Sequence, residues 1–196
     1  MKLIVITSPT PITNEIQAIT SMFEEGLDFL HIHKPAFSKK EIEDFIEQIP
    51  AKYHKQISMH ADFPKFHSLE ALKDHHPVAG QMAFLSPVFD SISKNGYKSK
   101  FTDRLNKFTQ IKPELIATIK GKNMVALGGV DTDKLELLKR VGFKGVATLG
   151  AIWHSKKPVE KFIDMRNIVN SKAFLRQELF LDESQNVSTT KLKRSE

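Results

Sequence analysis

The amino-acid sequence predicts an α/β fold in which parallel strands alternate with helices. Short apolar runs recur along the chain, and the segments between them carry apolar residues at helical spacing. The runs are apolar throughout rather than alternating, as expected for parallel strands that are covered on both faces. The chain has 196 residues, enough for one sizeable core and too few for two. We expect a single domain over residues 1–173 and a partly disordered extension over residues 174–196.

Six segments have the composition of buried strands. The first is β-branched and ends at Ser8-Pro9, the fourth ends at Ser86-Pro87, and the fifth ends at two glycines. The expected strands span residues 3–7, 29–33, 56–60, 82–85, 124–127 and 146–149.

The segments between and after these strands have helical periodicity. Ser38 and Glu41 form a capping-box pattern, and glycines follow the first and fifth helices as stop signals. The expected helices span residues 14–25, 38–49, 67–73, 102–108, 131–141 and 159–170. This alternation is typical of an open doubly wound sheet and of a closed (β/α) barrel, and both place functional residues at the carboxyl ends of strands.

Composition excludes several functional classes. The chain has no cysteine, which excludes disulfide frameworks, thiolate metal sites and cysteine nucleophiles. Its apolar runs are shorter than the ~20 residues that cross a bilayer, and the opening MKLIVIT is too short for a secretion signal. We therefore expect a cytoplasmic protein with no membrane partner. The net charge is +6, but the cations are scattered among few aromatic residues, so we expect no nucleic-acid partner. The sequence leaves a homodimer open.

Two glycine-containing turns are the strongest functional signal. Gly128 and Gly129 follow the fifth expected strand, and Leu149 and Gly150 follow the sixth. Such turns let a ligand approach the backbone, and the start of the next helix presents N–H groups that favour a phosphate. In barrels, the loops after the last two strands often bind a phosphate. We predict a phosphate site here; the alternative is that the glycines only make tight turns.

A polar loop follows the fourth expected strand and contains Ser91, Ser93 and Lys94. Hydroxyl groups together with an ammonium group suit a phosphate or a departing pyrophosphate. The alternative is a solvated loop.

Histidines provide a third set of candidates. His31 and His33 would share one face of the second expected strand, and His60 would end the third. Two or three imidazoles could bind a transition metal, and one could act as a general base near neutral pH. The alternative is that they line a pocket through hydrogen bonds.

Four blocks of the chain resemble or stand at motifs of one known family, and the order and spacing fit well after residue 80. Residues 86–94 resemble its Gly-Pro-x-Phe-x-Thr-x-Thr-Lys loop, and residues 125–130 with 145–152 resemble its two phosphate turns. Residues 29–34 stand at its second-strand motif, and residues 67–72 resemble its His-Ser-x-x-Glu segment. Over about residues 1–170 the chain resembles the thiamine-phosphate synthase / thiazole tautomerase family, which implies a (β/α) TIM-type barrel.

The resemblance also implies a reaction of thiamine biosynthesis with phosphorylated small-molecule substrates. A synthase of this family is a transferase that joins hydroxymethylpyrimidine diphosphate to thiazole phosphate and releases pyrophosphate, with Mg²⁺ present. By motif, the pyrophosphate contacts would be Ser91, Ser93 and Lys94. The contacts to the thiazole phosphate would be Gly128, Gly129, Leu149 and Gly150, and the catalytic residues would be His31, His33 and Lys94.

The sequence departs from the family at several of these positions. His33 stands where the family has an arginine, and Pro35 stands where a lysine is usual, with Lys34 as a neighbouring substitute. A neutral imidazole cannot replace the permanent, bidentate charge of a guanidinium group. The family's Asn-Asp pair is absent after the third strand, so Asp62 is the remaining candidate ligand for Mg²⁺.

About one βα unit is missing after residue 61. The barrel would then contain a gap with unpaired edges, unless residues such as 63–67 fill it irregularly or the barrel is distorted. Three functions are consistent with these departures: a synthase-like transferase, a thiazole-phosphate tautomerase that uses a histidine base, and a non-catalytic barrel that binds a phosphorylated metabolite.

Overall fold

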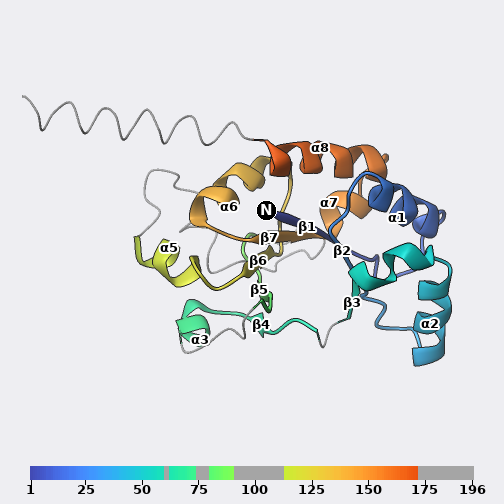
Figure 1. Cartoon of the computed structure of the whole chain (residues 1–196), viewed down its shortest axis with the longest axis horizontal. Helices are drawn as coiled ribbons and strands as arrows, with labels where there is room; N and C mark the ends of the chain where they lie inside the picture. The colour runs from blue at the N-terminus through green and yellow to red at the C-terminus, as the bar shows by residue number, and fades with distance from the viewer. Residues whose placement is uncertain (60–61, 74–79, 91–112, 172–196) are drawn as a thin grey trace, which may run out of the picture.

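One curved parallel sheet organises the molecule. The computed structural model describes residues 1–59, 62–73, 80–90 and 113–171. In these residues, seven strands form a sheet in the order β3-β2-β1-β7-β6-β5-β4, with every pair parallel (Figure 1). The strands are β1 (Lys2–Ile6), β2 (Phe29–His31), β3 (Ile57–Ser58), β4 (Lys65–Phe66), β5 (Ala83–Leu85), β6 (Met124–Leu127) and β7 (Gly145–Thr148). The predicted α/β class and TIM-type (β/α) architecture are confirmed.

Helices cover the outer face of this sheet. The α-helices are α1 (Glu15–Glu24), α2 (Lys39–Glu47), α3 (Leu69–Lys73), α5 (Pro113–Ile119), α6 (Leu135–Val141), α7 (Gly150–Trp153) and α8 (Pro158–Asn170). Two 3-10 helices are η1 (Ala51–Gln56) and η2 (Thr132–Lys134). The predicted capping box is present, because Ser38 accepts a hydrogen bond from the N–H of Glu41 and the Glu41 carboxylate accepts one from the N–H of Ser38.

Several predicted boundaries are wrong. The expected strand over residues 29–33 ends at His31, and the expected helix over residues 131–141 is divided into η2 and α6. Strand β4 was not expected at all, because Lys65–Phe66 has no apolar run around it and is held by pairing with β5. The expected helix over residues 102–108 and the expected extension over residues 174–196 lie outside the described residues.

The connection between β3 and β4 explains the missing unit. Residues 59–64 join the two strands, which is too short for the dozen or so residues that a βα crossover requires. β3 and β4 are therefore the two ends of the sheet rather than neighbours. The described sheet is an incomplete ring that is open between these strands.

Side chains alternate between two apolar layers. The larger core lies between the sheet and the helices and contains Leu3, Val5 and Leu30, while Ile4 and Ile6 belong to a second cluster inside the curved sheet. This inner cluster also holds Phe84, Val125 and Ala147 from β5, β6 and β7. Phe63, from the short β3–β4 connection, packs against it. A side chain from this connection thus fills part of the interior that a further strand would line.

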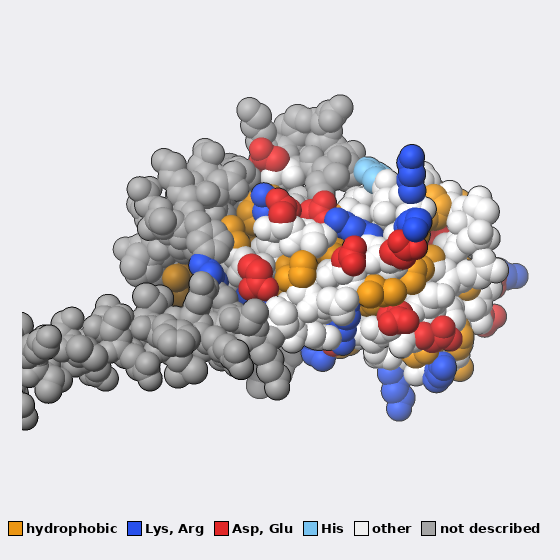
Figure 2. Space-filling model, turned by 90° about the horizontal axis from the view of Figure 1, so that it is seen from above, with side chains coloured by type: hydrophobic (Ala, Val, Ile, Leu, Met, Phe, Trp, Pro, Cys, Tyr) orange, Lys and Arg blue, Asp and Glu red, His pale blue; other side chains and the backbone are white. Residues whose placement is uncertain are grey.

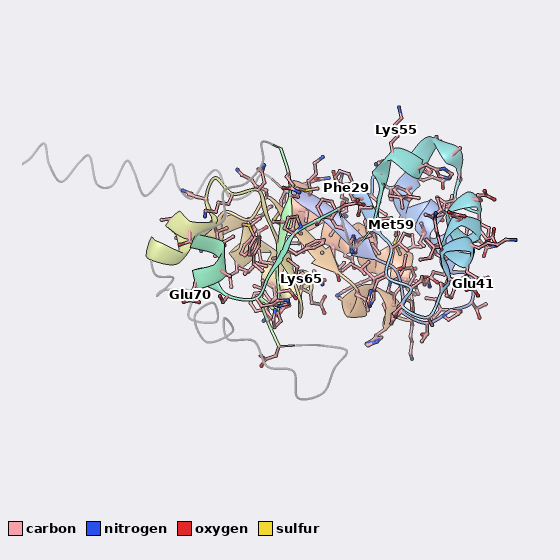
Figure 3. The ribbon with its side chains drawn as sticks, turned by 90° about the horizontal axis from the view of Figure 1, so that it is seen from below. Phe29, Glu41, Lys55, Met59, Lys65 and Glu70 are labelled. Atoms are coloured by element: carbon pink, nitrogen blue, oxygen red, sulfur yellow. The ribbon has the colours of Figure 1, made fainter. Side chains whose placement is uncertain are left out.

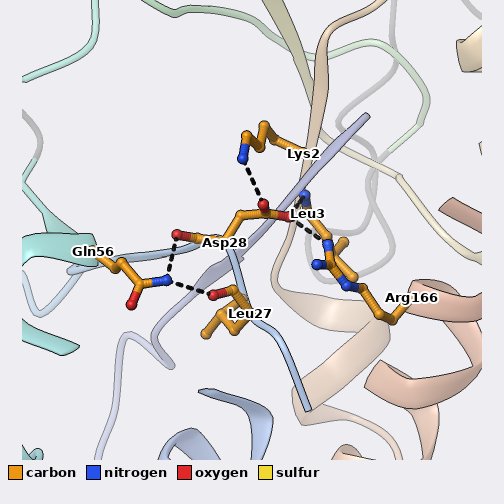
Figure 4. A network of polar contacts seen from close by, with 6 residues as sticks. All are labelled: Lys2, Leu3, Leu27, Asp28, Gln56 and Arg166. Carbon is orange, nitrogen blue, oxygen red and sulfur yellow. Dashed lines mark hydrogen bonds and ion pairs between the residues drawn. The ribbon is translucent and has the colours of Figure 1, made fainter. Parts of the chain in front are cut away.

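A charged network ties the amino ends of β1 and β2 to α8 (Figure 4). The Asp28 carboxylate accepts hydrogen bonds from Lys2 Nζ and from the backbone N–H of Leu3, both at 2.9 Å, and from Arg166 Nη1 at 2.5 Å. Gln56 Nε2 donates to the carbonyl oxygens of Leu27 and Asp28. Burial opposes the charged carboxylate, but these hydrogen bonds and cations hold the pKa of Asp28 below its ordinary value.

The described outer surface carries charges of both signs. Figure 2, which looks onto the side of the molecule that α8 and α1 cover, shows lysine and arginine side chains interspersed with aspartate and glutamate. The net charge of +6 is therefore not gathered into one basic patch on the described part of this face. None of the helices in the described ranges has the length and hydropathy that spanning a bilayer requires.

Candidate active site

A cavity of about 620 Å³ lies at the carboxyl ends of the strands. Six of its lining residues end a strand or follow one directly, including Ile6 of β1, His31 of β2 and Leu127 of β6. The lining residues are Ile6, Ser8, Pro9, Thr10, Ile12, His31, His33, Pro35, Lys65, Ser86, Pro87, Leu127, Gly128, Leu149, Trp153 and His154. Parallel strands direct their carboxyl ends to one side of the sheet, which is where (β/α) barrels place their active sites.

The two histidines of the second-strand block line this cavity in different ways. His31 is only 4% exposed, its Nδ1 lies 3.1 Å from Ser58 Oγ, and its ring packs edge-on against Phe84 at 5.3 Å between centroids. His33 lies beyond the end of β2, and its side chain is exposed. Its backbone N–H donates to Thr7 Oγ1 at 2.8 Å, which fixes the chain at this point. His31 is thus a rigid part of the floor, whereas His33 lies at the accessible wall.

The two glycine turns lie side by side. β6 pairs with β7, and Leu127 stands opposite Ala147, so the turns leave adjacent strands. Gly128 and Leu149 line the cavity, whereas Gly129 and Gly150 do not. Outside helices and strands, no hydrogen bond among the described residues uses the N–H group of Gly129 or Gly150.

The glycines at the first turn are also required by the protein's own packing. A Cβ on Gly128 would lie 2.9 Å from Pro87, and a Cβ on Gly129 would lie 2.2 Å from the carbonyl oxygen of Asp90. The carbonyl oxygens of Leu127 and Gly128 accept hydrogen bonds from Val88 and Phe89. The turn is therefore packed directly against the segment that follows β5, which accounts for both glycines without a ligand.

That segment leads from the cavity into the predicted pyrophosphate loop. Ser86 and Pro87 line the cavity. Ser91, Ser93 and Lys94 lie outside the described residues, so their role stays a prediction.

Lys34 does not take the place of the lysine that the family has one position later. Its side chain is fully buried, and Nζ lies 2.5 Å from Glu15 Oε2. Phe37 and Phe45 lie beneath the same ammonium group, at 5.5 and 4.9 Å. Lys34 thus faces α1 and α2 and does not line the cavity.

The described donors do not fit a Mg²⁺ site. Asp62 is exposed and does not line the cavity, and its Oδ2 accepts a hydrogen bond from the N–H of Met59. No three acidic or histidine side chains within the described ranges are grouped closely enough to hold a metal ion. Mg²⁺ is held by carboxylate oxygens with water and substrate phosphates, and neither aspartate nor glutamate is present among the described lining residues. We therefore derive no step through a metal.

Sequence reasoning missed most of the cavity lining, including three residues with a cationic or aromatic side chain. His154 was not among the predicted site residues, and the short helix α7 places it at the cavity wall. Trp153, on the same helix, lines the cavity and donates from Nε1 to the carbonyl oxygen of Ile6 at 2.7 Å. Lys65 lies on the unexpected strand β4. Once β4 is known, strand alternation places Lys65 on the inner side, but the sequence alone gives no signal for the strand.

Comparison with known proteins supports the fold and shows a likeness to one class of enzyme. No protein-family model matches the sequence, and no curated protein matches it. Among solved structures, thiamine phosphate pyrophosphorylase from Bacteroides thetaiotaomicron is 26% identical, with 88% of this chain and 99% of that chain covered and a TM-score of 0.66.

Two more distant structures support the fold alone. Thiamine phosphate pyrophosphorylase from Pyrococcus furiosus is 14% identical, with 86% of this chain and 95% of that chain covered and a TM-score of 0.56. (S)-3-O-geranylgeranylglyceryl phosphate synthase from Thermoplasma acidophilum, in complex with sn-glycerol-1-phosphate, is 13% identical, with 86% and 92% covered and a TM-score of 0.54. The fold of this chain therefore resembles that of thiamine phosphate pyrophosphorylase and of related (β/α) barrel enzymes that act on phosphorylated compounds.

Proposed function

We propose that the cavity is the active site of a thiamine-phosphate synthase-like transferase. Its substrates would be hydroxymethylpyrimidine diphosphate and thiazole phosphate. The observation that carries this proposal is that one cavity is bordered both by the adjacent β6 and β7 turns and by the two histidines of the second-strand motif. The likeness to the Bacteroides thetaiotaomicron pyrophosphorylase, which spans nearly all of that chain, supports the same reaction.

The reaction depends mainly on positioning the two substrates and on stabilising the charge of the leaving pyrophosphate. The bond between the pyrimidine methylene carbon and the diphosphate oxygen breaks, and the pyrophosphate leaves with the electron pair. The thiazole nitrogen then donates its lone pair to the same carbon. The protein contributes by holding both rings in one cavity and by stabilising the charge of the leaving group.

Each cavity element has a place in this proposal. The N–H groups at the β6 and β7 turns would bind the thiazole phosphate: those of Gly128 and Leu149 from the cavity lining, and those of Gly129 and Gly150 from the next residue of each turn. His31, fixed by Ser58, would define the floor of the pyrimidine side, and His33 would contact the diphosphate from the wall. Ser91, Ser93 and Lys94 would hold the pyrophosphate.

The test is direct synthesis. The full chain is mixed with both substrates, with Mg²⁺ or with EDTA, and thiamine phosphate is measured after oxidation to its fluorescent thiochrome. We expect product from the wild-type protein and at least tenfold less from His33→Ala. The absence of product at high enzyme concentration, with and without Mg²⁺, would exclude the transferase.

A thiazole-phosphate tautomerase is the second candidate. It needs a phosphate site and a proton shuttle but no diphosphate or metal site. The observation that favours it is that three imidazoles, and no carboxylate, are present among the described residues that line the cavity. A proton moves off one ring position and onto another, and His33 is the accessible base. A thiazole tautomer that converts no faster with the protein than without it would exclude this function. Measurable binding with no turnover of either kind would leave the chain a non-catalytic binding protein.

A further inference from the structure

A buried ion pair lies directly behind the wall of the cavity. Lys34 Nζ lies 2.5 Å from Glu15 Oε2, and the exposed fractions of the two side chains are 0% and 5%. Lys34 stands between His33 and Pro35, which both line the cavity. Ser8 also lines the cavity, and its backbone N–H donates to the other carboxylate oxygen of Glu15 at 3.0 Å. Glu15 therefore contacts two segments of the cavity wall at once.

These two segments follow neighbouring strands. Residues 7–14 lie between β1 and α1, and residues 32–38 lie between β2 and α2. The strands β1 and β2 are paired in parallel, so both segments begin at the same edge of the sheet. The N–H of His33 donates to Thr7 Oγ1 at 2.8 Å where the segments begin. The ion pair is thus a second connection between the same two segments, beyond the ends of the strands.

The wall is not backed by a solid core. A second cavity of about 580 Å³ lies on its other side, and Glu15, Lys34 and Phe37 are among the residues that line it. Ile12 lines both cavities. The segment after β1 is therefore a partition between two spaces. Side chains in a core are fixed by close packing, whereas the position of this partition depends on its polar contacts.

The opening in the ring gives a reason for such a connection. Beyond β2 lies only the two-residue strand β3, which ends the sheet. Figure 3 shows the two sides of the opening, with Met59, after β3, on the side of η1 and α2, and Lys65, on β4, on the side of α3. The segment after β2 therefore lies near a free end of the sheet, where fewer strands hold it than in a closed ring.

The energetics of the pair favour a positioning role. Two buried charges lose their hydration, and replacing such a pair by apolar side chains of similar volume is often neutral or stabilising. Stability alone would therefore be served as well by an apolar pair. The hydrogen bond between the two charges adds a defined length and direction. The rings of Phe37 and Phe45 also lie 5.5 and 4.9 Å from the ammonium group of Lys34, which fixes its approach to Glu15.

We propose that Glu15 and Lys34 are positioning residues, whose ion pair joins the segments after β1 and β2 and holds Ser8 and His33 at the cavity wall. The inference rests on the proposed function in one respect, namely that this cavity binds the substrates. Neither Glu15 nor Lys34 lines the cavity. Each acts through a neighbour: Glu15 through the N–H of Ser8, and Lys34 through the adjoining His33.

A double variant of the full chain tests this inference. Glu15→Gln with Lys34→Met removes both charges, keeps an acceptor for the N–H of Ser8 and places a flexible apolar side chain against the two aromatic rings. Because no charge is left unpaired, its melting temperature should stay close to that of the wild type. Hydrogen exchange of the His33 N–H, followed by NMR, measures how firmly the segment is held. Loss of a charged hydrogen bond should speed this exchange, relative to the amides of β1, by about tenfold or more.

Asp28→Asn provides a matched control. Asp28 also belongs to a partly buried charged network, but this network lies at the amino ends of the strands and does not line the cavity. The control should lower the melting temperature and leave the relative exchange of the His33 N–H unchanged. The inference is overturned by equal relative exchange in the wild type and the double variant, or by the same acceleration in Asp28→Asn. A double variant that does not melt cooperatively would also overturn it, because the pair would then be required for folding itself.

Synthesis of thiamine phosphate separates this inference from the proposed function. In that assay, the double variant should have a kcat/KM at least about tenfold below that of the wild type. Faster exchange at His33 in the double variant, with no product from the wild-type protein, would support the positioning role and exclude the transferase. Product formed by the double variant at the wild-type kcat/KM would support the transferase and overturn the inference.

Discussion

The packing of Gly129 against the segment after β5 leads to a quantitative prediction. Gly129 has a φ of +62°, and a Cβ placed on it would lie 2.2 Å from the carbonyl oxygen of Asp90 and 2.7 Å from the Cβ of Phe89. The first of these contacts is to backbone, so no side-chain rotation can relieve it. Gly129→Ala should therefore force the β6 turn and the segment after β5 apart.

The expected loss in the free energy of unfolding of Gly129→Ala has two parts. An alanine in the left-handed region costs about 1–2 kcal/mol, and overpacking of a close contact costs about 1–3 kcal/mol more. The free energy of unfolding should fall by roughly 2–5 kcal/mol in total. For a domain of this size, that loss lowers Tm by roughly 5–15 °C.

A substitution at Gly121 serves as a control that separates the conformational cost from the packing cost. Gly121 has a φ of +88°, and a Cβ on it would meet nothing within 4 Å. Gly121→Ala should therefore lose only the conformational part, about 1–2 kcal/mol. Both variants are compared by urea titration and thermal melting. If Gly129→Ala is no less stable than Gly121→Ala, the close packing of the β6 turn cannot be the reason for the glycine.

Three further predictions concern buried charge and the cavity. Glu15→Gln leaves the fully buried ammonium group of Lys34 without its counter-charge and should lower the free energy of unfolding by about 3–5 kcal/mol; a loss below 1 kcal/mol in a urea titration, the range of about 0–1 for exposed ion pairs, would contradict the burial of the pair. Because the pKa of Asp28 is lowered in the folded state, its stabilising effect is present above the ordinary aspartate pKa and is lost as the pH falls through the lowered value. Unfolding curves should therefore show that Asp28→Asn abolishes part of the acid-dependent loss of stability, and an unaltered pH profile would argue against the network. Trp153 is the single tryptophan and lines the cavity, so its fluorescence should change when pyrophosphate or thiazole phosphate binds, and saturable binding without any such change would place the ligand elsewhere.

Local patterns were sufficient to predict most of the architecture. Strands such as β1 and β6 are continuous apolar runs with clear stop signals, and α2 begins at a capping box that involves neighbouring residues only. Such signals depend on burial and on contacts along one turn of chain, both of which a sequence shows directly. Strand β4 has neither signal, because Lys65–Phe66 is extended only where β5 supplies its pairing partner. A two-residue strand that is defined by a distant partner cannot be read from its own residues.

Some of the residues that line the cavity were predicted from the sequence, and others were not. Sequence reasoning placed His31 and the β6 and β7 turns at one edge of the sheet, since parallel strands share their carboxyl ends. It left Lys34 open as a substitute for the family's lysine, because Lys34 lies next to that position. The structure instead pairs Lys34 with Glu15, on another element. The direction of a loop side chain depends on such partners, and the sequence does not specify them.

At the β6 turn, the close packing of Gly129 and the proposed phosphate contact involve different atoms of the same residue. The direction in which Gly129 would carry a Cβ is occupied by Asp90, while its N–H is used by no described hydrogen bond outside helices and strands. The Cβ and N–H bonds of a residue leave the backbone in different directions, so occupation of one does not exclude use of the other. The close packing accounts for the glycine, and the proposed phosphate contact would use its N–H group. Evidence for a ligand must therefore come from binding at the N–H side, because the presence of the glycine is already explained by the protein itself.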